Sequence, residues 1–146
     1  MFMNSEVVFK LIDIFYPTLP KVIALSIGKP TIEKIEGILD GYKEKNCHLM
    51  GCLLGDKLAG VAGFEIFSKK AKLKHLSILP EFRGKGYGRC MIKNLMNYFS
   101  VAEICAETDD ESIGFYKALN FMCSAYEGKY GKRYRCSLSV YKNSSK

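Results

Sequence analysis

The spacing of apolar residues in the first third of the chain is mostly three or four, as in helices. The first run consists of Val7, Val8, Leu11, Ile12 and Phe15, and is punctuated by Pro17 and Pro20. A second helix is expected from about Thr31, between Pro30 and Gly41. Its apolar stripe would be Ile32, Ile35, Ile38 and Leu39. The pattern therefore predicts two helices before any sheet.

After residue 47 the apolar pattern becomes that of strands separated by tight turns. A glycine-rich loop at 83–88 follows the third strand, and an amphipathic helix of about 89–99 follows the loop. The predicted strands cover about 48–54, 58–67, 73–79, 101–106, 122–126 and 134–141, with a further helix over 110–119. This order predicts an α+β or α/β fold with a mixed sheet.

The chain length of 146 residues suits a single domain spanning 1–146, with 142–146 expected as a frayed tail. Hydrophobic residues make up 48% and charged residues 25%, which is typical of a globular protein. No uncharged apolar run approaches the roughly 20 residues of a membrane span, and the first residues lack the basic segment followed by an apolar one that is typical of a signal peptide. We therefore expect a cytoplasmic protein that neither enters nor crosses a membrane.

The six cysteines are scattered and form no C-x-x-C pair. A zinc site would need a second close pair beside Cys47 and Cys52, and the sequence has none. We expect reduced thiols, mostly buried, and no bound metal.

The net charge is +7 and the isoelectric point about 9.1, which favours an anionic partner. Residues 1–73 contribute +2 and residues 74–146 contribute +5, so the excess lies with the glycine-rich loop. A helix that begins after glycines offers unpaired N–H groups to a phosphate, and Arg83, Lys85 and Arg89 add cations. The loop does not match the spacing of a Walker loop or of a dinucleotide fingerprint.

Two sequence blocks resemble the GCN5-related N-acetyltransferases (GNAT). Arg83-x-x-Gly86-x-Gly88 is similar to that family's [QR]-x-x-G-x-[GA] signature, and Ile78-Leu79-Pro80 to its V-x-P. The segment 109–121 resembles the family's N-x-x-A-x-x-[FL]-Y-x-x-x-G-F. Asp109, Ser112 and Asn120 depart from that pattern, where Asn, Ala and Gly are usual.

The resemblance implies a mostly antiparallel GNAT sheet flanked by helices, with acetyl-CoA as the acyl donor. It implies that loop amides hold the pyrophosphate and that strand and helix residues contact pantetheine. The residues implied for this are Ile78, Leu79, Arg83, Gly84, Lys85, Gly86, Tyr87, Gly88, Arg89, Asp109 and Ser112. Because Asp only accepts hydrogen bonds, Asp109 either contacts pantetheine or caps the following helix, where Thr108 and Glu111 resemble a capping box.

The family reaction is direct attack of a primary amine on the thioester in a ternary complex. The resemblance assigns Tyr116 as the general acid for the leaving thiolate; the alternative is a core aromatic residue. No base is assigned: the candidates are His75, Glu65, Glu103, Glu107 or a water chain. Strict alternation would place Lys74 on the opposite face from His75.

The alternative to an enzyme is a GNAT-like module that senses acyl-CoA or binds nucleic acid through its charge. The basic and aromatic run at 129–135 is compatible with nucleic-acid binding, but a solvated hairpin explains it better. We expect no nucleic-acid partner and either a monomer or a homodimer, and the acceptor amine is left open.

Overall fold

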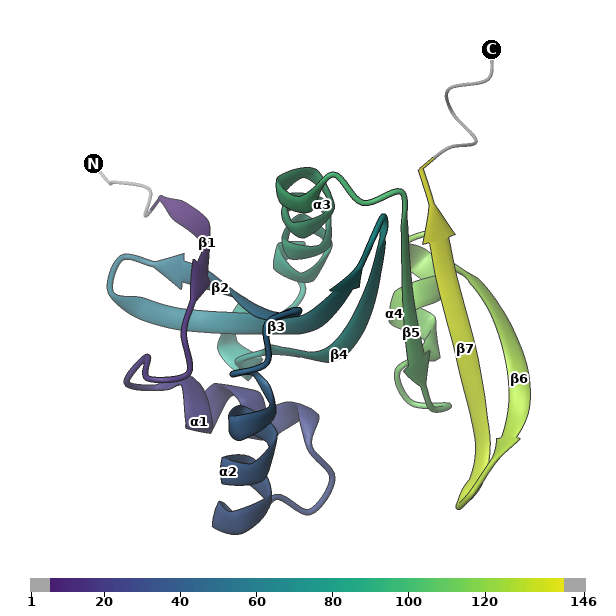
Figure 1. Cartoon of the computed structure of the whole chain (residues 1–146), viewed down its shortest axis with the longest axis horizontal. Helices are drawn as coiled ribbons and strands as arrows, with labels where there is room; N and C mark the ends of the chain where they lie inside the picture. The colour runs from purple at the N-terminus through teal and green to yellow at the C-terminus, as the bar shows by residue number, and fades with distance from the viewer. Residues whose placement is uncertain (1–5, 141–146) are drawn as a thin grey trace.

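A computed structural model describes residues 6–140 and shows one seven-stranded sheet in the order β1-β2-β3-β4-β5-β7-β6 (Figure 1). All neighbouring strands are antiparallel except β4 and β5, which run parallel. This is the mostly antiparallel, mixed sheet expected from the sequence. The strands are β1 (Val7–Ile12), β2 (Cys47–Leu54), β3 (Lys57–Phe67), β4 (Lys70–Ile78), β5 (Glu103–Thr108), β6 (Met122–Gly128) and β7 (Gly131–Ser139).

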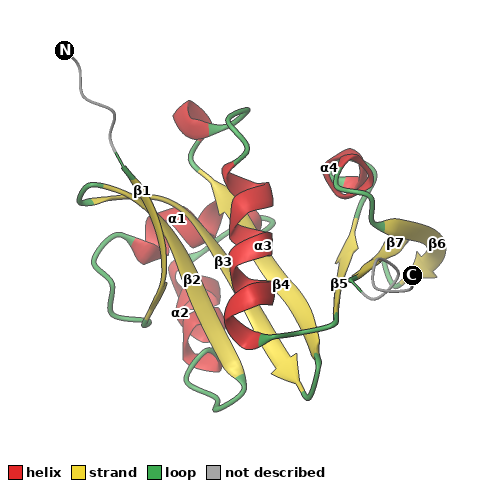
Figure 2. Cartoon of the chain, turned by 90° about the horizontal axis from the view of Figure 1, so that it is seen from above, coloured by secondary structure: helices red, strands yellow, loops and turns green. Residues whose placement is uncertain are grey.

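Four α-helices cover the two faces of the sheet. Helices α1 (Leu19–Ile23) and α2 (Ile32–Gly41) lie behind the sheet in Figure 2, and α3 (Tyr87–Phe99) lies in front of it. The fourth, α4 (Ile113–Ala118), leads into β6. Each face has its own core, since Met91 and Leu95 of α3 pack in one apolar cluster and Val22 and Leu39 of α1 and α2 in the other.

The prediction of a helix at the start of the chain was wrong, because Val7–Ile12 forms the edge strand β1. Apolar residues at 7, 8, 9, 11 and 12 fit a period of two as well as a helical period. In the structure Val7, Phe9 and Leu11 pack toward the core of α3, whereas Val8 is exposed. The six residues pair with β2 along their whole length, and this tertiary pairing decides between the two periods.

The second predicted helix is confirmed as α2, and Thr31 caps it by accepting a hydrogen bond from the Lys34 N–H. Ile32 of the predicted stripe is 76% exposed, so only the later members of the stripe face the core. Helix α4 is shorter than predicted. Thr108 is a buried residue of β5 and forms no capping box.

The expectation of six reduced thiols was wrong at one pair, because Cys123 and Cys136 form a disulfide. The two residues are direct cross-strand neighbours in the β6–β7 hairpin. Sequence spacing gave no sign of this, because the pairing depends on the register of two strands separated by a turn. Cys47, Cys52, Cys90 and Cys105 are free.

The run 129–135 forms the turn of this hairpin and the start of β7, as expected. Within residues 6–140, no helix is long and apolar enough to cross a membrane. The predicted frayed tail at 142–146 lies outside the described residues.

Candidate functional site

The glycine-rich loop leaves the end of β4 and enters α3 through two left-handed residues. Gly84 and Gly86 have φ of +77° and +85°, and Gly86 is the N-cap of α3. Residues with side chains adopt this conformation at a cost of about 1–2 kcal/mol, which explains glycine at both positions. The loop residues 83–86 are exposed.

The first turn of α3 presents a cationic, hydrogen-bond-donating surface. The N–H groups of Tyr87, Gly88 and Arg89 have no acceptor within the helix, and the helix dipole adds partial positive charge there. Arg89 is exposed, as are Arg83 and Lys85 of the loop. Arg83 also donates from Nε to the carbonyl of Ile78 at 2.8 Å, which ties the loop to the end of β4. The arrangement fits a phosphate or pyrophosphate group.

The sheet is split next to this loop. Strands β4 and β5 pair only from Lys70 to Leu73, opposite Glu103 to Ala106, and then separate, as Figure 1 shows. Beyond Leu73, β4 pairs on one side only, with β3. A parallel pair that opens in this way leaves a wedge lined by strand backbone.

The backbone of β4 offers hydrogen bonds to this wedge at alternate residues. The N–H of Leu79 donates to the Ala59 carbonyl at 2.8 Å, and the Leu79 carbonyl accepts from Phe82 at 2.9 Å. Backbone groups in an antiparallel ladder bond to the neighbouring strand at every second residue, so Leu79 fixes which residues of β4 bond to β3. The N–H and C=O groups of Leu76 and Ile78 therefore point away from β3, into the wedge. The structure thus presents both backbone groups of Leu76 and the N–H of Ile78 to a ligand there. The Ile78 carbonyl already accepts from Arg83, and the backbone groups of Leu79 are already bonded.

Asp109 lies across the wedge, after β5. Its Oδ1 accepts hydrogen bonds from the N–H groups of Glu111 and Ser112 at 3.1 and 3.0 Å. Both contacts lie within the turn that leads into α4, so Asp109 stabilises this turn and is not the N-cap of the helix. Ser112 is exposed and is the N-cap residue of α4, without a side-chain cap bond.

Tyr116 of α4 packs inside the core between Phe115 and Phe121, with ring centroids 5.1 and 5.2 Å away. Burial raises its pKa to about 12. Its hydroxyl makes no hydrogen bond to a described residue. Because residues 6–140 contain no buried side-chain oxygen without a partner, this hydroxyl reaches the surface. Tyr116 thus has a core ring and an open hydroxyl.

Helix α4 is held against the loop helix by a glycine. A Cβ on Gly88 would lie 3.0 Å from the ring of Phe115, so the lack of a side chain lets α4 approach the first turn of α3. The candidate phosphate site and the helix of Tyr116 are thereby neighbours.

A β-bulge lies at the mouth of the wedge. Gly63 pairs with His75 and Phe64 pairs with Leu73, so no β3 residue lies opposite Lys74 in the ladder. The extra residue breaks the alternation that the sequence suggested. The Lys74 ammonium lies 6.0 Å above the Tyr42 ring, and the His75 ring lies 5.7 Å from the same ring. Lys74 and His75 therefore face the same side, that of α1 and α2.

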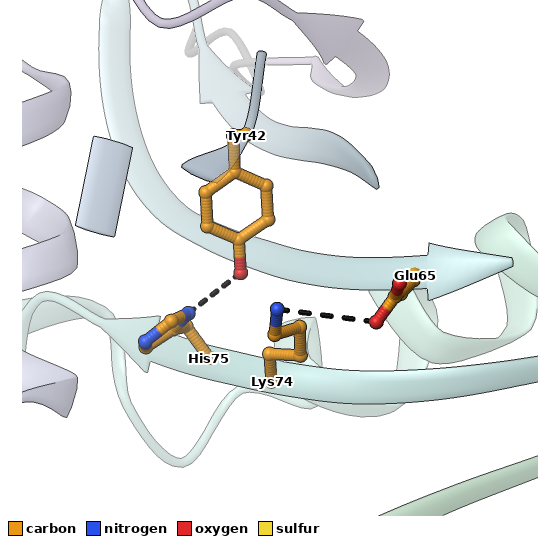
Figure 3. Close-up of polar contacts among 4 residues, drawn as sticks. All are labelled: Tyr42, Glu65, Lys74 and His75. Carbon is orange, nitrogen blue, oxygen red and sulfur yellow. Dashed lines mark hydrogen bonds and ion pairs between the residues drawn. The ribbon is translucent and has the colours of Figure 1, made fainter. Parts of the chain in front are cut away.

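His75 is hydrogen-bonded to Tyr42, which directly follows α2 (Figure 3). The Tyr42 Oη and His75 Nδ1 are 2.6 Å apart. Burial, and then the charge of Lys74, lower the pKa of His75, while burial strongly raises the pKa of Tyr42. A hollow of about 440 Å³ adjoins Tyr42 and is also lined by 11–15, Lys43 and Cys47.

The three carboxylates considered as bases all have partners. Glu65 lies 3.9 Å from the Lys74 ammonium, and Glu103 lies 3.8 Å from that of Lys70. Glu107 accepts a hydrogen bond from the Tyr126 hydroxyl and lies 3.8 Å from Arg135. Among the described residues no three His, Cys, Asp or Glu side chains are arranged to bind a metal ion.

The sequence profile of the Acetyltransferase (GNAT) family matches residues 11–121. The chain belongs to this family. The loop at 83–88 and the segment ending at Phe121 lie within the matched range, so this GNAT chain contains both blocks that suggested the resemblance. Among curated proteins, none is significantly similar in sequence.

Solved acetyltransferase structures share this fold over more than nine-tenths of the chain. The PaiA N-acetyltransferase of Thermoplasma acidophilum, crystallised with coenzyme A, is 18% identical with a TM-score of 0.68, covering 92% of this chain and 99% of that chain. A GNAT acetyltransferase of Elizabethkingia anophelis with acetyl-CoA bound is 11% identical, with a TM-score of 0.73 and coverages of 94% and 100%. The ribosomal-protein-alanine N-acetyltransferase of Escherichia coli is 16% identical, with a TM-score of 0.74 and coverages of 92% and 94%.

Sequence reasoning missed Tyr42 and Leu76. Tyr42 follows a helix that carries no motif, and only the packing of α2 over the sheet brings it to His75. Leu76 belongs to the strand before the loop, but its backbone direction depends on the hydrogen-bond phase of β3 and β4. The sequence carries no local signal for either property.

Proposed function

We propose that this GNAT protein transfers the acetyl group of acetyl-CoA to a primary amine in a ternary complex. The observation that carries the proposal is the split between β4 and β5, which lies beside a cationic glycine loop at a helix N-terminus. Acetyltransferase membership and relatives solved with CoA or acetyl-CoA support the donor.

In this proposal the loop holds the pyrophosphate of acetyl-CoA. Amides from Gly84 to Arg89 donate to its oxygens, and the side chains of Arg83, Lys85 and Arg89 neutralise its charge. The pantetheine arm then follows the open edge of β4, where Leu76 offers its N–H and carbonyl and Ile78 offers its N–H. Asp109 and Ser112 line the opposite wall as predicted pantetheine contacts.

Tyr116 is proposed to act on the leaving sulfur. A phenol with a pKa of about 12 stays protonated at neutral pH. It is a weaker acid than an ordinary thiol with a pKa of about 8.5. Its hydroxyl therefore stabilises the departing thiolate mainly as a hydrogen-bond donor, and the thiolate takes its final proton from solvent. The carbon–sulfur bond breaks as the amine nitrogen bonds to the carbonyl carbon.

The amine is proposed to approach from the face of α1 and α2. Helix α3 covers the other face of β2, β3 and β4 (Figure 2), and the loop that enters it would hold the donor. On the α2 face the mouth of the wedge carries His75, Tyr42 and Lys74, which are polar groups able to meet a polar acceptor. Donor and acceptor then meet at the split from opposite faces of the sheet.

The proposal is tested by titrating the protein with acetyl-CoA in a calorimeter and assaying thiol release over a panel of amines. The panel would contain polyamines, amino acids, aminoglycosides, and peptides with free N-termini or lysines. We expect micromolar binding and thiol release that depends on at least one amine. Binding without turnover of any amine would instead favour a module that senses acyl-CoA.

A thermal-shift comparison distinguishes the proposed enzyme from a module that binds nucleic acid. A ligand that binds only the folded state raises the melting temperature by mass action. We expect stabilisation by acetyl-CoA and none by an oligonucleotide at 150 mM salt. Stabilisation by the oligonucleotide alone would refute the enzyme proposal.

A further inference from the structure

We propose that His75 takes the proton from the acceptor amine through Nε2, and that Tyr42 positions it by accepting a hydrogen bond from its Nδ1–H. This inference rests on the proposed acetyl transfer. It assigns the step for which the sequence offered five candidates, and it adds a positioning residue from an element that carries no family motif.

The first support is the place of His75. It lies two residues beyond Leu73, the last residue of β4 that pairs with β5, so it flanks the mouth of the wedge. The bulge at Lys74 turns both side chains to the α2 face. Without the bulge, either Lys74 or His75 would face the core of α3 instead.

The second support is the state of the two ring nitrogens. Nδ1 lies 2.6 Å from the Tyr42 hydroxyl, while Nε2 has no hydrogen-bond partner among residues 6–140. Because no buried side-chain nitrogen in that range lacks a partner, Nε2 reaches the surface. A base needs an accessible nitrogen without a proton, and Nε2 is that nitrogen when Nδ1 carries the proton and donates a hydrogen bond to the Tyr42 hydroxyl.

The third support is the fit around Tyr42. Gly63 is the β3 residue opposite His75, and a Cβ at this position would overlap the Tyr42 hydroxyl. The missing side chain leaves the space in which the hydroxyl meets the imidazole. Tyr42 is 8% exposed, so packing fixes its ring.

The competing carboxylates are less suitable than His75. Glu65, Glu103 and Glu107 each lie within 4 Å of a cation, so an ion pair already occupies each carboxylate, whereas Nε2 of His75 has no such partner among residues 6–140. The proton balance is simple with His75. The ammonium loses a proton to Nε2, the free amine attacks the thioester, and the imidazolium returns the proton to solvent.

The charged and titratable groups around Tyr42 and His75 determine how the rate of transfer should change with pH. They are Lys74 on β4, Glu65 on β3 and Cys47 on β2, in addition to the Tyr42 hydroxyl. Burial and Lys74 lower the pKa of His75 below the usual 6.5, so the base stays neutral throughout the physiological range. The rate should fall only as the pH drops below about 6.5.

The first experiment needs no amine substrate. Long-range proton–nitrogen NMR of the ¹⁵N-labelled full chain at pH 8 shows which ring nitrogen of each histidine carries the proton. The chain has two histidines, and His48 lies on the other face against Phe64 and Phe99, so it serves as an internal reference. We expect His75 in a single tautomer with a protonated Nδ1, and both tautomers in Tyr42→Phe. A wild-type His75 protonated at Nε2 would overturn the proposal.

The second experiment follows thiol release from acetyl-CoA between pH 5 and 9, with the best amine of the panel or with water as the acceptor. His75→Gln should lower the rate at least tenfold and remove the acid limb, while His48→Gln should keep the wild-type profile. Tyr42→Phe should lower kcat several-fold with unchanged acetyl-CoA affinity. A wild-type pH profile in His75→Gln would overturn the assignment of the base.

These outcomes separate the two proposals. Failure of the wild-type protein to bind acetyl-CoA would refute the proposed function, whatever the tautomer of His75. Normal binding and turnover, together with an unaltered His75→Gln profile, would refute only the role of His75. Circular dichroism of each variant confirms that it is folded.

Discussion

A single unpaired residue determines which side chains meet at the mouth of the wedge. No β3 residue lies opposite Lys74 in the ladder, and this one-residue insertion places Lys74 on the same face as His75. Tyr42 joins them only because Gly63 leaves space for its hydroxyl. At the same scale, Tyr116 combines a core ring with an accessible hydroxyl, so its two candidate roles, core and catalytic, are compatible.

Substituting Tyr116 by Phe tests its hydroxyl without removing the ring. The core contacts to Phe115 and Phe121 remain, so we expect little change in stability and less than a twofold change in acetyl-CoA affinity. We expect kcat to fall about 10²-fold, because the thiolate loses its donor. Steady-state kinetics and calorimetric titration check this. An unchanged kcat would leave Tyr116 as a core residue only.

At the scale of elements, helices and loops were predicted correctly from the sequence where a short local motif determines the structure. Thr31 before an apolar stripe marked α2, and the glycines between β4 and α3 marked the loop. The prediction failed for Val7–Ile12, where six residues fit two periods and pairing with β2 decides. The wedge, the bulge and the Tyr42–His75 contact were not predictable, because each depends on pairing between segments that are distant in the chain.

Replacing Gly86 by Ala tests whether the loop conformation is needed for binding. Residue 86 has a φ of +85°, and a Cβ there costs about 1–2 kcal/mol. We expect the loop to shift and acetyl-CoA affinity to fall roughly tenfold, measured by calorimetric titration.

Gly37→Ala in α2 is the matched control for this loop substitution. A Cβ at Gly37 meets nothing within 4 Å, and its φ lies outside the left-handed region. Because alanine favours a helix over glycine, this variant should gain roughly 0.5–1 kcal/mol of stability with unchanged affinity. Equal acetyl-CoA affinities in the two variants would contradict the role of the loop.

At the scale of the whole molecule, the sheet consists of two parts joined by a short parallel contact. Strands β1 to β4 carry helices on both faces, and β5, β7 and β6 continue the sheet beyond the wedge. The second part contains the disulfide, and the positive charge excess is greater in residues 74–146. The contribution of the disulfide to stability and the contribution of the charge to ligand binding can be tested separately.

The double substitution Cys123→Ala and Cys136→Ala should destabilise the chain. A disulfide across 13 residues restricts the unfolded state by about 3 kcal/mol, which corresponds to a fall in melting temperature of roughly 6–12 °C. Calorimetry measures this fall, with Cys105→Ala as the free-thiol control. If all six cysteines of the unreduced, denatured protein react with an alkylating agent, the disulfide is absent.

Because the net charge is +7, we expect the affinity for acetyl-CoA to fall as salt is added, and we expect the donor phosphates to cause this fall. Exposed cations of the loop and α3 attract phosphates through a field that salt screens, since the Debye length falls from about 10 Å at 0.1 M to 3 Å at 1 M. Raising sodium chloride from 50 to 500 mM should weaken acetyl-CoA binding roughly tenfold. The affinity for acetyl-pantetheine, which lacks the phosphates, should change less than twofold.

Two charge substitutions test where the phosphates bind. Arg89→Gln should weaken the salt dependence of acetyl-CoA binding. Lys45→Gln removes an exposed cation in the other half of the chain and should leave the salt dependence unchanged. Equal slopes for the two donors would show that the phosphates make no ionic contact, and an unchanged slope in Arg89→Gln would place the phosphate site outside this loop.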